Sequence, residues 1–478
     1  MDSGNQAGPG PLRRIVGGSA LKYLGLTLLL AWHYCLWFVP NSYLELFILD
    51  DRITFSWLIA LALAALTHFS LALGLGGKRH LTPRPAIIWI ATLAGSAGTG
   101  VFTLFAVNDP NPAGAYLLSA VIGISAGLLW LLWGERYAAQ RAKFTIRRIA
   151  PTYAGFLLAS LLLASVLPGV FSPLFTSLLP LFSGLLLHVS AKGASGQRYP
   201  RLLPRQAARL GRLPILTVCV ISFVASFVSY FTVAIVPWEA VAVIDRSFTI
   251  GVAIGALFIL VIAGLQLLHS TRYTIFRTFP WLLFCEVIAC GLFLFSFATG
   301  FSAFLLALAI SSVLEILLTM YMGGLTLRGY VAPVVAFGLS GGAIRLGICL
   351  GNGLALVYEH VPWLAEVWTV PTMLAFIAIL TGLLIPLVRQ EYNISELVRS
   401  PQSISELDAQ VAQAAAEFKL SEREREIVSA LARGYTASAV AEKLFISPHT
   451  VNTHIQHIYD KMGIHKRSEL LNYLNKRD

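Results

Sequence analysis

Residues 420–471 read LSEREREIVSALARGYTASAVAEKLFISPHTVNTHIQHIYDKMGIHKRSELL, and their pattern decides how the rest of the chain is interpreted. Ser421 followed by Glu424 forms a capping box, which predicts that a helix begins here. Gly434 is expected to end this helix, and Thr436 can cap a second, shorter helix. Two short helices therefore open this stretch.

A third helix follows, since Ser447 is a favoured N-cap and Pro448 stands in the first turn. Gly463 is expected to end it, and a short fourth helix begins near Arg467. The apolar face of the third helix, which should pack on a core, has Val451, Ile455, Ile458 and Met462. The opposite face has His449, Asn452, Thr453 and Gln456. Two helices joined by a tight turn, the second with an exposed polar face, are typical of a helix-turn-helix unit.

Three motifs of this stretch occur together in one known family. They are L-[ST]-x-R-E-x-E at 420–426, I-S-x-x-T-V-x-x-H at 446–454 and K-[LM]-G-[VI]-x-x-R-x-E-L at 461–470. The segment resembles the LuxR-type (NarL/FixJ-type) DNA-binding domain. The resemblance implies double-stranded DNA as a partner and a homodimer formed on DNA through the fourth helix. It also raises the expectation that acids of the first helix contact RNA polymerase.

The polar face of the third helix predicts the base-reading side chains, namely His449, Asn452, Thr453 and Gln456. Phosphate contacts are expected from Lys443, Ser447, Thr450, Lys461 and Arg467. The family often has a basic residue where this chain has Asn452 and Gln456, and amides pair well with adenine. We therefore expect half-sites richer in A·T pairs. Residues 417–478 contain ten Lys and Arg against eight Asp and Glu, which predicts a shallow salt dependence of binding.

The remainder of the chain has the composition of a membrane protein. Of 478 residues, 56% are hydrophobic and 12% are charged, whereas soluble proteins have roughly 25% charged residues. A bilayer-spanning helix needs about 20 apolar residues. Twelve segments meet that length: 16–39, 54–75, 86–107, 113–134, 149–168, 170–191, 214–236, 247–268, 279–298, 301–325, 331–357 and 366–388.

The charges between these segments predict the orientation of the chain. Starting from the N-terminal tail, alternate loops contain twenty Lys and Arg, whereas the other loops contain only Arg52 and Arg246. The second set of loops also contains eight acids: Glu45, Asp50, Asp51, Asp109, Glu239, Asp245, Glu359 and Glu366. Because basic residues accumulate on the cytoplasmic side, we expect a multi-pass protein of the bacterial cytoplasmic (inner) membrane with both termini in the cytoplasm. We expect the first segment to remain uncleaved, since no small-residue cleavage site ends it.

A long basic loop, 192–213, divides the segments into six plus six. With the loop GLGGKRHLTPR at 74–84, this layout resembles the major facilitator superfamily, although the aspartate of that family's loop motif is missing. The resemblance implies two six-helix halves around a central cavity. The predicted fold class is all-α: a polytopic membrane protein with twelve transmembrane helices and a C-terminal four-helix helix-turn-helix domain. The predicted domains are a tail (1–15), a transmembrane sensor (16–388, halves 16–191 and 214–388), a linker (389–416) and the DNA-binding domain (417–478).

Ionisable groups inside the predicted spans are candidate functional sites, because burying them in a bilayer is costly. Glu315 and Arg345 are expected near the midplane as an ion pair, which either holds helices together, lines a ligand cavity or couples to protons. His33 and His68 are further cavity candidates, for which an interhelical hydrogen bond is the plainer interpretation. Glu286 is expected to be structural.

An aromatic stripe in the seventh segment adds a last cavity candidate. Phe223, Phe227, Tyr230 and Phe231 share one helix face. This face either lines an apolar or aromatic ligand site, with Tyr230 as its polar member, or packs against lipid and neighbouring helices. The five cysteines all fall inside predicted spans without metal-ligand spacing, and we interpret them as small buried hydrophobes.

The linker leaves two interpretations open. Leu397, Ile404, Val411 and Phe418 recur every seven residues, but Pro401 interrupts the repeat. One interpretation is a helix that docks on the DNA-binding domain. The other is a short coiled coil between two protomers.

No receiver domain, soluble ligand-binding domain, Walker loop, zinc cluster or nucleophile–base set is recognised, so we expect neither an enzyme nor a cofactor. The first hypothesis is a one-component transcription regulator that senses a small-molecule ligand in its membrane domain. The alternative is a secondary transporter with a fused regulatory DNA-binding domain. A third hypothesis is a scaffold that tethers DNA to the membrane constitutively.

Overall fold

The computed structural model describes residues 21–43, 51–76, 80–81, 84–139, 146–192, 202, 205–237, 241, 246–268, 278–396, 401–432, 435 and 437–475. The predicted tail 1–15 and the cap positions Gly434 and Thr436 lie outside them. The chain divides into two compact units, Met1–Arg389 and Gln390–Asp478. Within the described part of the chain all regular structure is helical.

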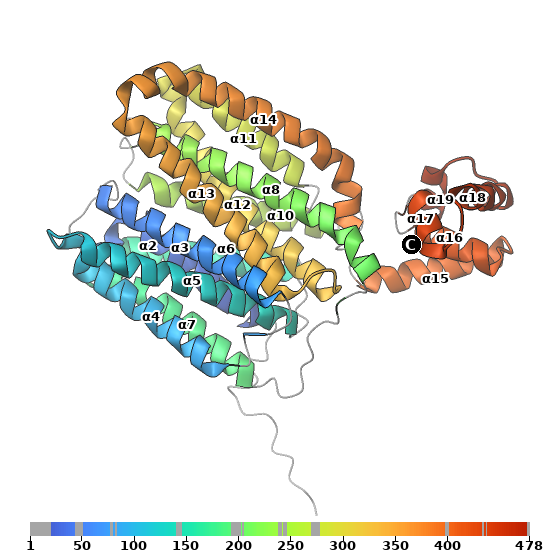
Figure 1. The fold of residues 1–478 in the computed structure, drawn as a ribbon, viewed down its shortest axis with the longest axis horizontal. Coiled ribbons are helices and arrows are strands. Elements are labelled where there is room, and N and C mark those ends of the chain that lie inside the picture. The colour runs from blue at the N-terminus through green and yellow to red at the C-terminus, as the bar shows by residue number, and fades with distance from the viewer. Residues whose placement is uncertain are drawn as a thin grey trace, which may run out of the picture. The chain divides into compact units, whose positions relative to one another are not determined.

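The first unit contains twelve long helices among its described residues (Figure 1). They are α2 (Leu21–Phe38), α3 (Asp51–Leu75), α4 (Pro85–Leu104), α5 (Ala113–Ala139), α6 (Ile146–Val166), α7 (Phe171–Lys192), α8 (Arg205–Ile235), α10 (Ser247–Leu268), α11 (Phe279–Phe295), α12 (Phe297–Leu327), α13 (Pro333–His360) and α14 (Pro362–Glu396). Short 3₁₀ turns follow α2 (η1, Pro40–Ser42) and α4 (η2, Ala106–Asn108). Each predicted membrane segment overlaps one of the twelve helices.

Length and hydropathy identify these helices as membrane spans. Among the described residues, nine are long and apolar enough to cross a bilayer, and three shorter apolar stretches are Leu24–Phe38, Thr152–Val166 and Phe279–Phe295. Large apolar side chains also remain on the outer surface of the bundle, for example Leu73 and Leu117, which are 78% and 71% exposed. A soluble monomer rarely shows apolar surface on this scale. The protein is therefore a polytopic membrane protein.

Several helices extend beyond the predicted membrane segments, and α8 and α14 do so by the greatest length. α8 begins at Arg205, inside the predicted loop 192–213, and α14 continues to Glu396, past the predicted end at 388. The added residues of α8 read RQAARLGRL, which are mostly strong helix formers. Hydropathy sets where the bilayer-length segment ends, whereas helix propensity allows the helix to continue into the polar region.

The two halves of the first unit repeat the same packing pattern. In the first half α2 packs on α6, α3 on α5, and α4 on α5. In the second half α8 packs on α13, α10 on α12, and α11 on α12, which are the same pairs six helices later. The halves meet where α3 packs on α13 and α6 packs on α10, again an equivalent pair of contacts.

Glycines allow α13 to approach α8 closely. A Cβ atom on Gly347 or Gly351 would overlap the backbone carbonyl of Phe223 or Phe227, respectively. Small residues at helix contacts are how membrane helices bring their backbones together.

The second unit comprises α15 (Pro401–Glu417), α16 (Glu422–Ala432), α17 (Ala437–Leu444), α18 (Pro448–Met462) and α19 (Arg467–Asn475). Its core contains Val411 and Ala414 of α15 together with apolar residues of the other four helices. The Phe418 ring also contacts the Tyr473 ring, with centroids 5.2 Å apart.

This packing favours the first of the two interpretations of the predicted linker 389–416. Its C-terminal part is a helix that docks on the helix-turn-helix unit. The repeat positions Val411 and Phe418 are used in that contact. They are therefore not available for a coiled coil between protomers.

Candidate functional site

The N-terminus of α18 is fixed by its cap, as the sequence predicted. The Ser447 hydroxyl accepts a hydrogen bond from the Thr450 backbone N–H at 3.0 Å, and Pro448 occupies the first turn. At the other end Gly463 adopts a left-handed conformation, with φ of 63°. The reciprocal capping box of α16 is also present, since Ser421 N–H donates to the Glu424 carboxylate at 2.7 Å and Glu424 N–H to the Ser421 hydroxyl at 3.2 Å.

The two faces of α18 divide as expected. Val451, Ile458 and Met462 are buried in the core, and Ile455 packs against them. The predicted base-reading residues His449, Asn452, Thr453 and Gln456 are all exposed. The structure therefore brings these four side chains together on the solvent-facing side of one capped helix.

The predicted phosphate-contacting residues differ in their surroundings. Ser447 and Thr450 lie exposed at the N-terminus of α18, where backbone N–H groups favour an anion. The Lys443 ammonium stacks over the Tyr435 ring, 4.6 Å from its centroid. Arg467 donates to the Leu431 carbonyl at 2.9 Å and so joins α19 to α16.

Lys461 has a structural partner that the sequence did not indicate. Its ammonium donates to the Glu424 carboxylate at 2.6 Å, joining the end of α18 to the start of α16. Burial alone would raise the pKa of Glu424, but hydrogen bonds from Lys461 and Ser421 outweigh it and lower this pKa to about 2. A phosphate would have to compete with this carboxylate for Lys461.

Arg423 of the first motif also supports the helix-turn-helix geometry. It donates to the Glu426 carboxylate and to the Leu444 carbonyl, each at 2.7 Å. Because Leu444 is the last residue of α17, this bond holds α16 against the turn that precedes α18.

In the membrane unit, Glu315 of α12 and Arg345 of α13 form an ion pair. The Arg345 Nη1 and Glu315 Oε1 atoms are 2.5 Å apart, and the two side chains are 9% and 5% exposed. The contact that the sequence predicted between them is present. Both helices belong to the second half of the unit.

The first half provides the polar and aromatic groups around this ion pair. The Tyr34 hydroxyl of α2 donates to the other Glu315 oxygen at 3.1 Å. The Trp130 ring of α5 lies 4.8 Å from the Arg345 guanidinium, a cation–π contact. Sequence reasoning missed both contacts, because nothing local pairs Tyr34 or Trp130 with residues two hundred or more positions away.

The remaining cavity candidates lie around the same ion pair. His33 and Arg345 both line a small cavity of about 30 Å³. His68 of α3 is 1% exposed and packs against Gly341 of α13. Tyr230 of α8 is 1% exposed, and its ring centroid lies 5.4 Å from that of Trp57. We define the central cluster as Tyr34, Trp130, Glu315 and Arg345 with His33, His68 and Tyr230 around them.

Glu286 makes a contact between two helices, in keeping with the structural role expected from the sequence. It is fully buried, and one carboxylate oxygen accepts a hydrogen bond from the Ser229 hydroxyl at 2.9 Å. This bond joins α11 to α8 within the second half.

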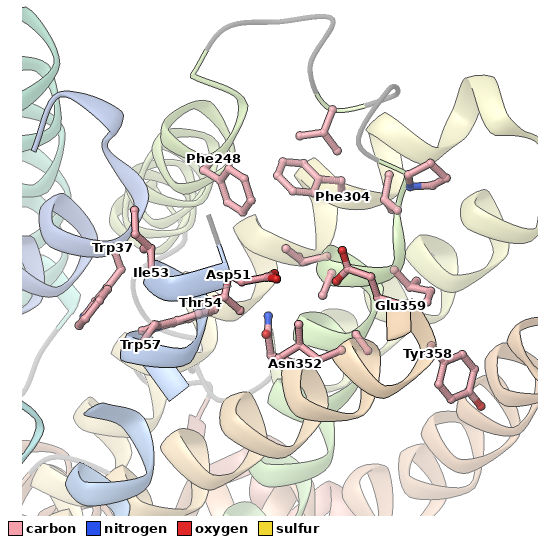
Figure 2. A pocket seen from close by; sticks show the side chains of 18 of the residues that line it. Trp37, Asp51, Ile53, Thr54, Trp57, Phe248, Phe304, Asn352, Tyr358 and Glu359 are labelled. Atoms are coloured by element: carbon pink, nitrogen blue, oxygen red, sulfur yellow. The ribbon is translucent and has the colours of Figure 1, made fainter. Parts of the chain in front are cut away.

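A larger pocket of about 520 Å³ opens at one end of the helices (Figure 2). It lies among the ends of α2, α3, α8, α12 and α13 and the start of α10. We call it the acidic pocket, because the charged side chains that line it are Asp51 and Glu359. Trp37 and Trp57 line both this pocket and the small cavity at Arg345, so they separate it from the central cluster.

Comparison with known proteins identifies the C-terminal unit. Residues 419–474 match GerE, the family described as bacterial regulatory proteins of the luxR family. The chain is 37% identical over 73 residues to the probable transcriptional regulatory protein NarL of Mycobacterium tuberculosis, covering 15% of this chain and 34% of that protein. It is 45% identical over 58 residues to the oxygen regulatory protein NreC of Staphylococcus aureus, covering 12% and 27%. The chain thus spans about a third or less of the curated relatives it matches. Residues 419–474 are a LuxR-type helix-turn-helix domain.

Transporters are among the solved structures that match this chain. A mutant of the peptide transporter POT has a TM-score of 0.49 at 14% identity, covering 79% of this chain and 95% of that one. The E. coli fucose:proton symporter FucP has a TM-score of 0.48 at 14% identity, covering 78% and 97%. Because these scores lie below 0.5, no conclusion about transport follows from them.

Proposed function

We propose that this protein is a membrane-anchored one-component transcription regulator. It senses a small molecule through its membrane unit and binds promoter DNA through its helix-turn-helix domain. The observation that supports this most is that one chain joins a LuxR-type domain to a polytopic helical unit with a buried ion pair beneath a pocket. In this proposal the protein lies in the bacterial cytoplasmic membrane, with both termini in the cytoplasm.

At the DNA end, the exposed face of α18 enters the major groove. Asn452, Thr453 and Gln456 read base edges, with His449 beside them. Ser447 and Thr450 at the helix N-terminus contact phosphate, together with Lys443, whereas Lys461 and Arg467 take part in domain packing first. Two protomers bind two half-sites, and the α19 helices form the contact between the protomers. The exposed Glu422 on α16 is a candidate for contact with RNA polymerase.

At the membrane end, the central cluster couples the two halves. Glu315 and Arg345 come from the second half, whereas Tyr34 and Trp130 come from the first. A ligand that binds one arrangement of the halves more tightly than another shifts the population toward that arrangement. Such a shift changes the hydrogen bonds and the cation–π contact that surround the buried ion pair. The two arrangements of the halves therefore differ in their polar contacts, and so in free energy. α14 then continues into the second unit, which links the membrane state to DNA binding.

Transcript profiling tests the proposal. Cells producing the wild-type protein or the double variant Asn452→Ala/Gln456→Ala are compared with cells lacking it, with and without candidate compounds. We expect a set of promoters that responds to a compound only with the wild-type protein, at equal membrane abundance of the two forms. A compound response that is retained in the double variant contradicts DNA reading by α18. Promoters that respond to the protein but never to a compound support constitutive tethering instead.

A secondary transporter with a fused regulator is the alternative, because a buried ion pair beneath a pocket also suits ligand movement across the membrane. Uptake of the identified compound into vesicles containing the purified protein separates the two functions. Accumulation above the level of empty vesicles supports transport, whereas binding without accumulation supports a sensor.

A further inference from the structure

The acidic pocket has a chemistry of its own, distinct from the central cluster. Figure 2 shows Asp51, Asn352 and Glu359 pointing into the same open space. Asp51 is the first residue of α3, and the other two lie near the C-terminal end of α13. Two helices that are far apart in the sequence therefore deliver three oxygen-bearing side chains to one pocket.

The Asn352 side chain lacks a hydrogen-bond partner on its acceptor side. Its residue is 6% exposed, and its Oδ1 atom is buried with no hydrogen bond within the described structure. Because this oxygen is closed to solvent, Asn352 contributes the polar edge of its amide group to the pocket wall and not an open acceptor.

Asp51 and Glu359 provide charge next to this amide. Both are exposed to the pocket, and neither forms an ion pair with any residue that the structure describes. The pocket thus presents two carboxylates, which accept hydrogen bonds. A bound group with positive charge and N–H donors would match both.

Aromatic rings form much of the remaining wall. They belong to Trp37, Phe38, Trp57, Phe248, Phe304 and Tyr358. The Phe248 and Phe304 rings pack edge to face with centroids 4.9 Å apart, and Phe38 and Trp57 do so at 5.4 Å. Aromatic faces attract cations and also bury apolar groups. A metal ion fits less well, since Ca²⁺ takes six to eight oxygen ligands and the described residues gather no metal-binding group of acids, His and Cys.

We propose that the acidic pocket binds an organic cation. An ammonium group of the ligand lies between the carboxylates of Asp51 and Glu359, beside the Asn352 amide, while its apolar body lies against the aromatic rings. Trp37 and Trp57 at the floor place the body next to the small cavity that contains His33 and Arg345. The inference rests on the proposed function only for the step from binding to transcription.

Four probes with the same apolar body test the charge requirement. They are 4-phenylbutylammonium, 4-phenylbutyltrimethylammonium, 4-phenylbutanol and 4-phenylbutyrate, titrated by calorimetry into the purified full-length protein in nanodiscs. We expect 4-phenylbutylammonium to bind at least about tenfold more tightly than the alcohol or the carboxylate. Equal affinities for the ammonium, the alcohol and the carboxylate would show simple apolar partition and overturn the proposal. So would tighter binding of the carboxylate.

Isosteric variants then locate the site. Asp51→Asn and Glu359→Gln should each weaken ammonium binding by about two- to fivefold, as expected for partly exposed charges, and the double variant by more than about tenfold. Glu366→Gln is the matched control, because Glu366 is an exposed acid near the start of α14 that does not line the pocket. The trimethylammonium probe keeps the charge without N–H donors, and it should also bind more weakly to the double variant than to the wild-type protein. Unchanged ammonium binding in a double variant that elutes as a single peak would place the cation elsewhere and overturn the assignment.

The outcomes for the pocket and for the proposed function remain separable. Ammonium binding that responds to the variants without any change in transcription supports the pocket and contradicts sensing. The protein could instead bind all four probes equally and still change transcription in response to a compound. That outcome supports sensing and contradicts cation binding in the acidic pocket.

Discussion

At the residue scale, the buried Glu315–Arg345 ion pair is the feature for which we expect single substitutions to be most costly. Each charge is nearly excluded from solvent, and each is compensated mainly by the other. Glu315→Leu or Arg345→Leu leaves one uncompensated buried charge, which costs on the order of 3–5 kcal/mol. We expect either variant to lower membrane abundance strongly or to lock signalling.

The double variant Glu315→Leu/Arg345→Leu serves as the control for this prediction, because it removes both charges. It should recover abundance relative to the single variants, measured by quantitative immunoblotting of membranes. Normal abundance and signalling in both single variants would show that the pair is neither structural nor functional.

The exposed amides of α18 lead to a second prediction. Asn452 and Gln456 can each form two hydrogen bonds with adenine, so replacing either by Ala should cost roughly 1–3 kcal/mol and relax one base preference. Binding of a 390–478 fragment to a randomised DNA pool measures both effects, since this unit has its own apolar core. If base preferences survive unchanged in both variants, the reading face lies elsewhere on the helix.

Glu424 gives a pH-dependent prediction for the same fragment. Its pKa in the folded unit is about 2, below the ordinary 4.5, so its charge stabilises the fold. This stabilisation is fully present above about pH 4.5 and is lost as the pH falls toward 2. Glu424→Gln keeps the helix cap and should lower the free energy of unfolding at pH 7 by about 1–2 kcal/mol, after allowing for the exposure of Lys461.

Urea denaturation of wild type and variant at pH 7 and pH 3 measures this difference. It should shrink at the lower pH. Glu422→Gln is the matched control on the same helix, because the Glu422 side chain is 84% exposed and its charge is largely screened. A difference for Glu424→Gln that is equal at both pH values would rule out the Lys461 pair as its cause.

At the scale of elements, local signals predicted the helix-turn-helix unit well. The Ser447 cap, the capping box and the Gly463 terminus depend on residues within four positions, so the sequence shows them directly. The bilayer helices were also recognisable, because each needs only a run of apolar residues. What hydropathy could not show is how far α8 and α14 continue into polar sequence.

Contacts between elements were mostly beyond sequence reasoning. The Tyr34–Glu315 hydrogen bond joins residues 281 positions apart, and the Lys461–Glu424 bond joins residues 37 positions apart. Opposite charges at similar depth indicated the Glu315–Arg345 pair, but no such rule points to a tyrosine or tryptophan partner. The acidic pocket was missed for the same reason, since Asp51 and Glu359 were counted only as loop acids.

The close contact of α13 with α8 predicts a contrast between two glycines. Gly351→Ala should destabilise the membrane unit by about 1–3 kcal/mol, because the added Cβ overlaps the Phe227 backbone. Gly353→Ala on the same helix meets open space and should be neutral or slightly stabilising. Size-exclusion recovery after heating a fluorescent fusion compares them. Equal recovery of the two variants would contradict the close approach of these helices.

At the scale of the whole molecule, the helix count and the loop charges predict the topology. A reporter fused after residue 388, or within 192–213, should behave as cytoplasmic, whereas one near Asp245 should behave as external. Paired alkaline phosphatase and fluorescent-protein fusions give opposite readouts on the two sides of the membrane. An external location for 192–213 would contradict the proposed orientation, because this segment has the most basic residues of any predicted loop.

One polypeptide contains both the bilayer helices and the recognition helix. Under the proposed function, the protein cannot diffuse through the cell interior to find its operator. The operator must instead be brought to the envelope by the motion of the nucleoid. The time that the protein needs to meet its operator is then set by the motion of the chromosome. The position of a target gene on the chromosome therefore affects its regulation. A promoter held deep in the nucleoid would respond slowly even when its operator sequence is ideal.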